Sequence, residues 1–272
     1  MANSHRLVPA ALLGLAGRVV WQLLGTLPPS PRLAVVGSRA AHRHPRSCIP
    51  PIVEAATTCG YALVSGGARG IDAAVHHAAL ASGAPQLAIV PCQPDAPYPP
   101  EHAELFAEIA RAPGSGVLFA LPSGVRACRG IFASRNALVV AAATSVLVAE
   151  AAPRSGSWGT GGLALRRGVS TAALLGSAGC ADLVVRGAHS LPADSTTVKT
   201  AVIAWLEGGT RSSAASWPAE LAWLAAALAR GRAQGVGLDD LGDPSLACAA
   251  LVSAEILGLV FESPPGRYHL RV

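Results

Sequence analysis

The chain has 272 residues, of which 51% are hydrophobic and 14% charged, and its formal net charge is +5. This length allows one sizeable core and a smaller second one, and the charge favours a polyanionic partner over a cationic one. No stretch reaches the roughly 18 uninterrupted apolar residues of a membrane span, and Arg18 interrupts the apolar start. We therefore expect a cytoplasmic protein without a membrane partner.

The six cysteines are scattered along the chain, with neither a C-x-x-C pair nor a histidine at metal-ligand spacing. This pattern argues against a zinc site and against a disulfide framework. We expect no metal and no cofactor.

Residues 1–30 predict a short helical remnant, which ends in the proline-rich linker Pro28–Pro31. From Leu33 onward, short runs of Val, Leu and Ile alternate with Ala-rich segments of helical length. This alternation predicts a Rossmann-like, doubly wound α/β domain over residues 31–210, with helices on both faces of a parallel sheet. The predicted strands are Leu33–Val36, Ala62–Val64, Leu87–Val90, Val117–Leu121, Val146–Ala149, Thr171–Leu175 and Leu183–Val185, and the clearest helices are Asp72–Ala81 and Glu101–Ala110.

Residues 215–272 predict a small winged-helix domain, which follows a flexible joint at Arg211–Ser213. Two short strands, Leu259–Glu262 and Arg267–Leu270, flank a Pro-Gly turn and form the wing. The last predicted helix has no Arg or Lys, which argues against insertion into a DNA major groove and favours a protein contact. The helical pieces are Glu220–Arg230, Leu238–Leu241 and Ser245–Leu257.

Doubly wound sheets bind ligands beyond the carboxyl ends of their strands, so the residues that follow each strand are the functional candidates. Gly37, Ser38 and Arg39 follow the first strand. Glycine lets backbone N–H groups face an anion, serine and arginine add donors, and the positive end of the next helix adds its dipole. A tight turn with a solvated arginine explains the same tripeptide equally well.

The second strand leads into the glycine-rich loop Ser65–Asp72, which reads Ser-Gly-Gly-Ala-Arg-Gly-Ile-Asp. Three glycines exceed what turning requires and indicate backbone close to a ligand, although the loop is neither G-x-G-x-x-G nor a Walker A sequence. It predicts an anion cradle with Arg69 as its cation. Asp72 caps the next helix or contacts the ligand, and His76 is expected to pack or lie on the surface rather than to catalyse.

Further candidates follow the later strands. Tyr98 is expected to plug its loop rather than to stack on a base. Phe132, Arg135 and Asn136 offer stacking, phosphate neutralisation and an amide, which are the contacts of an unpaired nucleic-acid strand; the alternative places Phe132 in the core and Arg135 on the surface. The segment Glu150–Gly162 is again dense in glycine and hydroxyls. Four such segments at one sheet edge favour an extended ligand over a single phosphate.

In order and spacing, these motifs resemble the DNA-processing protein A (DprA, or Smf) family. The resemblance runs from about Leu33 to Leu191, and residues 237–270 look like the family's winged-helix domain. The resemblance implies a non-enzymatic protein that binds and protects single-stranded DNA, forms a homodimer through the Rossmann-like domain and loads the RecA recombinase during natural transformation. The motifs are Val36–Arg39, Ser65–Asp72 with His76, Tyr98–Glu101, Phe132 with Arg135 and Asn136, and Glu150 with Arg154–Ser157.

The resemblance also implies a set of DNA-binding residues on four segments. They are Gly37, Ser38 and Arg39; Gly66, Gly67, Arg69 and Gly70; Phe132, Arg135 and Asn136; and Ser155, Gly156 and Ser157. The chain departs from the family at Ala137, where a second arginine is usual, and at Pro91–Gln93, where Gly-Cys-Gly is usual. Both departures predict weaker DNA binding.

An alternative is a nucleotide-cleaving phosphoribohydrolase of the lysine-decarboxylase-like family. Trp158–Gly162 near Glu150 is similar to the Gly-Gly-x-Gly-Thr-x-x-Glu signature of those enzymes, but here the glutamate precedes the glycines. We expect Glu150 to orient loop amides rather than to act as an acid or base.

Overall fold

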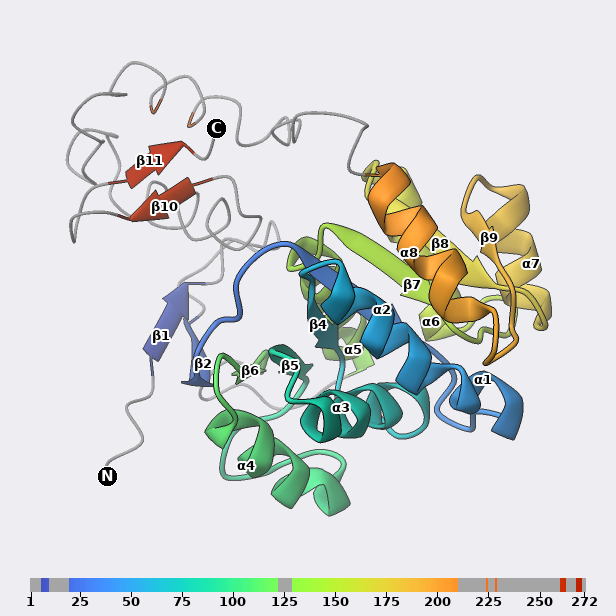
Figure 1. The fold of residues 1–272 in the computed structure, drawn as a ribbon. Helices are drawn as coiled ribbons and strands as arrows, with labels where there is room; N and C mark the ends of the chain where they lie inside the picture. Colours follow the sequence, from blue (N-terminus) through green and yellow to red (C-terminus); the bar gives the residue numbers. More distant parts are fainter. Residues whose placement is uncertain are drawn as a thin grey trace.

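In the computed structural model, the residues described are 6–9, 20–121, 129–209, 224, 228, 260–262 and 268–270. Their main feature is a sheet of nine strands with helices on both faces (Figure 1). The strands are β1 (Arg6–Pro9), β2 (Val20–Gly25), β3 (Arg32–Val36), β4 (Ala62–Ser65), β5 (Gln86–Val90), β6 (Gly116–Phe119), β7 (Ser145–Val148), β8 (Ser170–Leu174) and β9 (His189–Leu191). They lie in the order β1-β2-β6-β5-β4-β3-β7-β8-β9.

The strands from β6 to β9 in this order all pair in parallel, so their carboxyl ends lie at one edge of the sheet. The chain moves outward from β3 through β4, β5 and β6, and then returns to the other side of β3 with β7. The crevice between the loops that follow β3 and β7 is therefore the topological switch point, where such sheets bind ligands. The predicted doubly wound α/β fold is confirmed.

Helices cover both faces because each strand buries alternate residues on opposite sides. Leu33 and Val35 of β3 pack with α2, α3 and α8, whereas Ala34 and Val36 pack with α5, α6 and α7. This double burial explains why the strands read as continuous apolar runs. The helices are α1 (Arg43–Ser47), α2 (Ile49–Thr58), α3 (Ile71–Ser82), α4 (Ala103–Arg111), α5 (Arg129–Ala141), α6 (Gly156–Arg166), α7 (Ala178–Val185) and α8 (Val198–Gly209), with a 3₁₀ turn, η2, at Pro100–His102.

The prediction of a helical remnant over residues 1–30 is wrong for the part that is described. β1 and β2 pair with each other, and β2 pairs antiparallel with β6, placing Leu23 opposite Leu118. Leu23 is buried whereas its neighbours Gln22 and Leu24 are only partly so, an alternation typical of a strand. The pattern of a short apolar run fits a helix as well as a strand. The pairing of Val20–Gly25 with β6 makes this segment a strand.

The predicted strand at Leu183–Val185 is also wrong, because these residues form the end of α7. Leu183 is fully buried in the core, while Val185 is 87% exposed, so only one side of this apolar run faces the protein. The last strand of the sheet is β9, in which only Leu191 is buried. The sequence did not predict β9, because this strand is short and largely polar.

At the C-terminal end, β10 (Val260–Glu262) and β11 (Tyr268–Leu270) form an antiparallel pair at the two predicted wing strands. Most residues of the three helices predicted before them, and the joint at Arg211–Ser213, lie outside the described residues. The winged-helix domain therefore stays a prediction. Within the described parts of the chain, no helix has the length and apolarity needed to cross a bilayer.

His76 is fully buried on α3, as the packing interpretation predicts. Its Nδ1 lies 2.7 Å from Oε1 of Gln86, and Nε2 of Gln86 donates to the His76 carbonyl at 3.3 Å. Nε2 of His76 has no hydrogen-bond partner among the described residues. Burial lowers the pKa of His76 from 6.5 to about 4, because the protonated ring would lose its hydration.

The free energy of unfolding should consequently fall as the pH drops from about 6.5 to 4. In this window the unfolded chain binds a proton at residue 76 that the folded protein excludes. Between pH 7 and about pH 4.5 we expect a loss of about 2 to 3 kcal/mol from this group. Urea unfolding of the wild type and of His76→Gln at both pH values isolates the effect; equal losses in the two proteins would contradict it.

Candidate nucleic-acid interface

A cleft opens at the carboxyl edge of the sheet, beside β4 and β5. Its walls come from the loops that follow β3, β4 and β5 and from α5, so three of the four predicted segments meet there. Arg39, Gly66, Gly67, Ala68, Arg69, Pro91, Tyr98, Pro99, Phe132 and Arg135 line the cleft.

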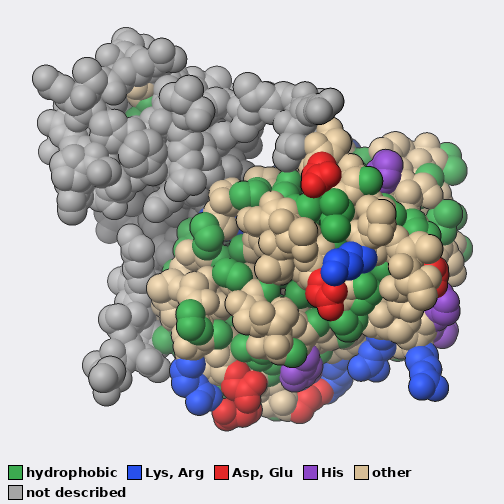
Figure 2. Space-filling model, in the orientation of Figure 1, with side chains coloured by type: hydrophobic (Ala, Val, Ile, Leu, Met, Phe, Trp, Pro, Cys, Tyr) green, Lys and Arg blue, Asp and Glu red, His purple; other side chains and the backbone are tan. Residues whose placement is uncertain are grey.

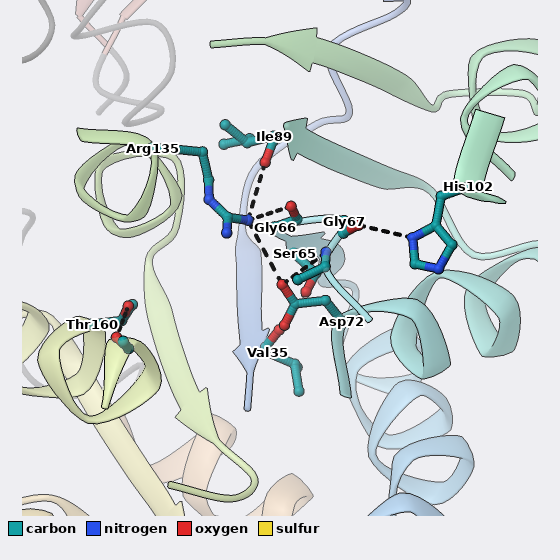
Figure 3. Close-up of polar contacts among 11 residues, drawn as sticks. Val35, Ser65, Gly66, Gly67, Asp72, Ile89, His102, Arg135 and Thr160 are labelled. Carbon is teal, nitrogen blue, oxygen red and sulfur yellow. Dashed lines mark hydrogen bonds and ion pairs between the residues drawn. The ribbon is translucent and has the colours of Figure 1, made fainter. Parts of the chain in front are cut away.

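Beneath the cleft, a buried ion pair joins α3 to α5. Nη1 of Arg135 lies 3.7 Å from Oδ2 of Asp72, and the two side chains are only 6% and 7% exposed. The same Nη1 donates to the carbonyl of Gly66 and makes a longer contact, 3.4 Å, with the carbonyl of Ile89 (Figure 3). Burial lowers the pKa of Arg135 and raises that of Asp72, and in each group the opposite charge counteracts this shift.

The carboxylate of Asp72 occupies the predicted anion cradle. It accepts hydrogen bonds from the backbone N–H of Ala68, at 3.3 Å, and from that of Gly37. It lies in the first turn of α3, where the helix dipole favours a negative charge. The anion held by these N–H groups is thus the protein's own carboxylate, and a bound phosphate would depend on other donors.

Two glycines of the loop Ser65–Asp72 make room for the protein rather than for a ligand. A Cβ on Gly66 would overlap the guanidinium of Arg135. A Cβ on Gly70 would overlap the carbonyl of Ser38, and Gly70 also has a left-handed backbone with φ 78°. The N–H of Ile71 donates to that same Ser38 carbonyl at 3.2 Å. The density of glycine therefore reflects the close packing of the loops that follow β3 and β4.

The expectation that the next helix directs its positive end at Gly37–Arg39 is wrong. That helix, α1, begins only at Arg43, and the start of α3 packs against this loop instead. The Ser38 hydroxyl accepts the N–H of Ala40 at 3.2 Å and shapes the turn. Arg39 is the part of this segment that stays exposed.

An exposed cluster of one cation and two rings forms the rim of the cleft. Cζ of Arg39 lies 5.1 Å from the centre of the Phe132 ring, and the Tyr98 ring meets Phe132 edge-on with 5.9 Å between centroids. Tyr98 is 45% exposed and is not the buried plug that the sequence predicts. The alternative that buries Phe132 and exposes Arg135 is wrong as well, because Arg135 is buried while Phe132 is half-buried at the cleft.

Arg69 also lines the cleft, and it pairs with Glu101 in the 3₁₀ turn η2. The two side chains are 60% and 49% exposed. The hydrogen bond from Arg69 lowers the pKa of Glu101 to about 2, and the pairing raises the pKa of Arg69. Next to them, Nδ1 of His102 lies 3.0 Å from the Gly67 carbonyl and anchors the glycine-rich loop to η2 (Figure 3).

The loops that follow β3 and β7 meet at the switch point. Oε2 of the buried Glu150 accepts the N–H of His42 at 3.1 Å, and its Oε1 pairs with the imidazole of His42. The expectation that Glu150 orients a loop amide is confirmed. The predicted binding residues Ser155, Gly156 and Ser157 start α6 and do not line the cleft. They adjoin it through Asn136, whose Nδ2 would lie 3.7 Å from a Cβ on Gly156.

Sequence reasoning missed Tyr98, Glu101, Pro91 and Pro99 as parts of the site. Tyr98, Pro99 and Glu101 carried a signal, because all three belong to a motif that resembles the family. The cleft contact of Pro91 depends on how the loop that follows β5 folds back, which local sequence does not encode.

The fold and the cleft define a Rossmann-like α/β protein with a cationic and aromatic site at its sheet edge. Residues 21–202 match the family described as DNA recombination-mediator protein A, and the chain belongs to this family. A Mycobacterium tuberculosis (strain H37Rv) protein named as a DNA processing protein DprA is 41% identical over 163 residues, which cover 57% of this chain and 41% of that protein. The chain therefore matches about two fifths of the length of this relative.

Two solved structures share the fold. The structure of DNA processing protein A from Streptococcus pneumoniae has a TM-score of 0.60 and 28% identity, covering 71% of this chain and 70% of that one. The DNA processing protein A of Helicobacter pylori, solved to describe how it binds single-stranded DNA, has a TM-score of 0.62 and 22% identity, covering 75% of this chain and 97% of that one. At 22% identity, the second likeness concerns the fold alone.

Gly70→Ala tests whether the packing of the loops that follow β3 and β4 holds this edge together. The substitution combines a left-handed backbone with overlap of the Ser38 carbonyl, and we expect a loss of about 3 kcal/mol or more in the free energy of unfolding. Gly83→Ala is the matched control, because Gly83 has φ 69° but no atom within 4 Å of its Cβ position. Its expected loss is about 1 kcal/mol. Equal losses in urea unfolding would show that the loop contact contributes nothing.

Proposed function

We propose that the chain binds single-stranded DNA in this cleft, protects incoming DNA and loads the RecA recombinase onto it during transformation and recombination. The observation that carries the proposal is the exposed cluster of Arg39, Phe132 and Tyr98 beside the glycine-rich loop. Aromatic faces stack on unpaired bases and a nearby arginine contacts phosphate, which is how single strands are bound without sequence preference. Membership of the family supports the same function.

Within this proposal, the candidate residues divide by exposure into binding and positioning groups. Arg39 is exposed and forms no ion pair within the described residues, so its charge is available to a phosphate. Phe132 offers a ring and Asn136 an amide at the border with α6. Arg135 is buried, donates to the Gly66 carbonyl and acts by positioning the glycine-rich loop. Arg69 must exchange the carboxylate of Glu101 for a phosphate, so it contributes less than an unpaired arginine.

The proposal extends to partners and location. We propose that the protein is cytoplasmic, that it forms a homodimer through the Rossmann-like domain and that it acts without catalysing a reaction. Family membership supports the partners. The phosphoribohydrolase alternative is not favoured, because the carboxylate of Glu150 is buried on His42 and does not line the cleft.

Fluorescence anisotropy with labelled oligo-dT tests the cleft. Arg39→Ala should weaken binding about 5-fold at 0.1 M salt and reduce the slope of log K against log salt by about 0.7, the value of one lost phosphate contact. Phe132→Ala should weaken binding by about 5- to 100-fold and leave the slope unchanged, since stacking carries no net charge.

The matched control is Arg186→Ala. Arg186 lies over the Trp158 ring at the same 5.1 Å, but it follows α7, away from the cleft, and pairs with Asp182. It should bind oligo-dT like the wild type. Equal weakening by all three substitutions, or a wild type that binds no oligo-dT and releases ribose phosphate from AMP, would refute the proposal.

A further inference from the structure

Apart from Arg32, which is buried and donates to the carbonyls of Pro28 and Ala142, the arginines whose side chains are described fall into two groups according to their ion pairs. Arg69, Arg111, Arg135 and Arg186 each pair with a carboxylate. A second group is exposed and forms no ion pair with any described residue: Arg39, Arg43, Arg46, Arg154, Arg166 and Arg167. Exposed, unpaired guanidinium groups are the ones that can take a phosphate without first giving up a carboxylate.

Three members of the unpaired group lie within eight residues. Arg39, Arg43 and Arg46 are all exposed, and residues 37–48 contain no Asp or Glu. Figure 2 shows basic and histidine side chains gathered over α1, at the lower right of the view. The segment 40–48 contains no Phe, Tyr or Trp, so it offers charge without a large stacking ring. Such a surface suits the phosphate backbone rather than bases.

Arg154 belongs to the loop that follows β7, the strand next to β3. β3 and β7 are parallel neighbours, so the loops that follow them leave the same edge side by side. Glu150, at the end of β7, is bonded to both the N–H and the ring of His42, just before α1 begins. Glu150 is therefore buried and engaged, while Arg154, four residues later, is exposed and forms no ion pair with any described residue.

Arg39 connects this surface to the cleft. Its guanidinium lies over Phe132 in the cleft, and its backbone leads directly into α1. We propose that Arg43, Arg46 and Arg154, which we name the α1 surface, bind a second stretch of single-stranded DNA phosphates. A strand held in the cleft then continues across the β3–β7 switch point and over α1. This inference rests on the proposed function and extends the binding site from the cleft to α1.

The test compares a short and a long oligo-dT, of about 5 and about 20 nucleotides, in anisotropy titrations at several salt concentrations. Arg43→Ala/Arg46→Ala should bind the short oligonucleotide within twofold of the wild type. This variant should bind the long oligonucleotide at least about 10-fold more weakly than the wild type at 0.1 M salt. The slope of log K against log salt should be smaller by about 1.4, the value of two lost phosphate contacts. Arg43→Lys/Arg46→Lys should restore most of the loss, because lysine keeps the charge.

The matched control is Arg166→Ala/Arg167→Ala. These arginines are also close in sequence, exposed and unpaired, but they lie at the end of α6, at the opposite edge of the sheet. The control should bind both oligonucleotides like the wild type. If the α1 variant binds the long oligonucleotide as the wild type does, or weakens both lengths equally, the inference fails while the cleft proposal stands. If the wild type binds neither length, the proposed function fails and the inference fails with it.

Discussion

The buried ion pair between Asp72 and Arg135 is the interaction on which the carboxyl edge of the sheet depends. It links the first turn of α3 to the middle of α5, and through Gly66 and Ile89 it reaches the ends of β4 and β5. Removing one partner would leave a buried charge without compensation, which typically costs about 3 to 5 kcal/mol. Because Asp72 also holds the N–H groups of Ala68 and Gly37, the same pair fixes the loops that follow β3 and β4.

This arrangement separates the groups that build the site from those that meet a ligand. The carboxylate of Asp72 fills the cradle of backbone N–H groups, and Arg135 forms its ion pair with that carboxylate. What remains for a ligand is the outer layer, namely Arg39, Phe132 and Tyr98 on the rim and the unpaired arginines over α1. Ala137 lies on α5 where an arginine is usual in the family, so this position adds no charge to the outer layer.

The sequence predicted the parallel sheet because buried strands leave a strong local pattern of apolar runs between Ala-rich segments. It failed at Val20–Gly25 and Leu183–Val185, where the same apolar composition fits either element and pairing with β6 or packing of α7 decides. Three of the four predicted segments line the cleft, but the motifs did not give the direction of each side chain. Whether Arg135 faces solvent or the Gly66 carbonyl depends on how α5 packs over β5, a long-range contact that no local pattern encodes.

A double-mutant cycle across the ion pair tests this account most directly. The free energy of unfolding is measured in urea for the wild type, Asp72→Asn, Arg135→Gln and the double variant. We expect each single substitution to cost about 3 kcal/mol or more, and the double to cost at least about 1 kcal/mol less than their sum, because neither charge is then left alone. Strictly additive losses would show that the two side chains do not interact and would contradict the account.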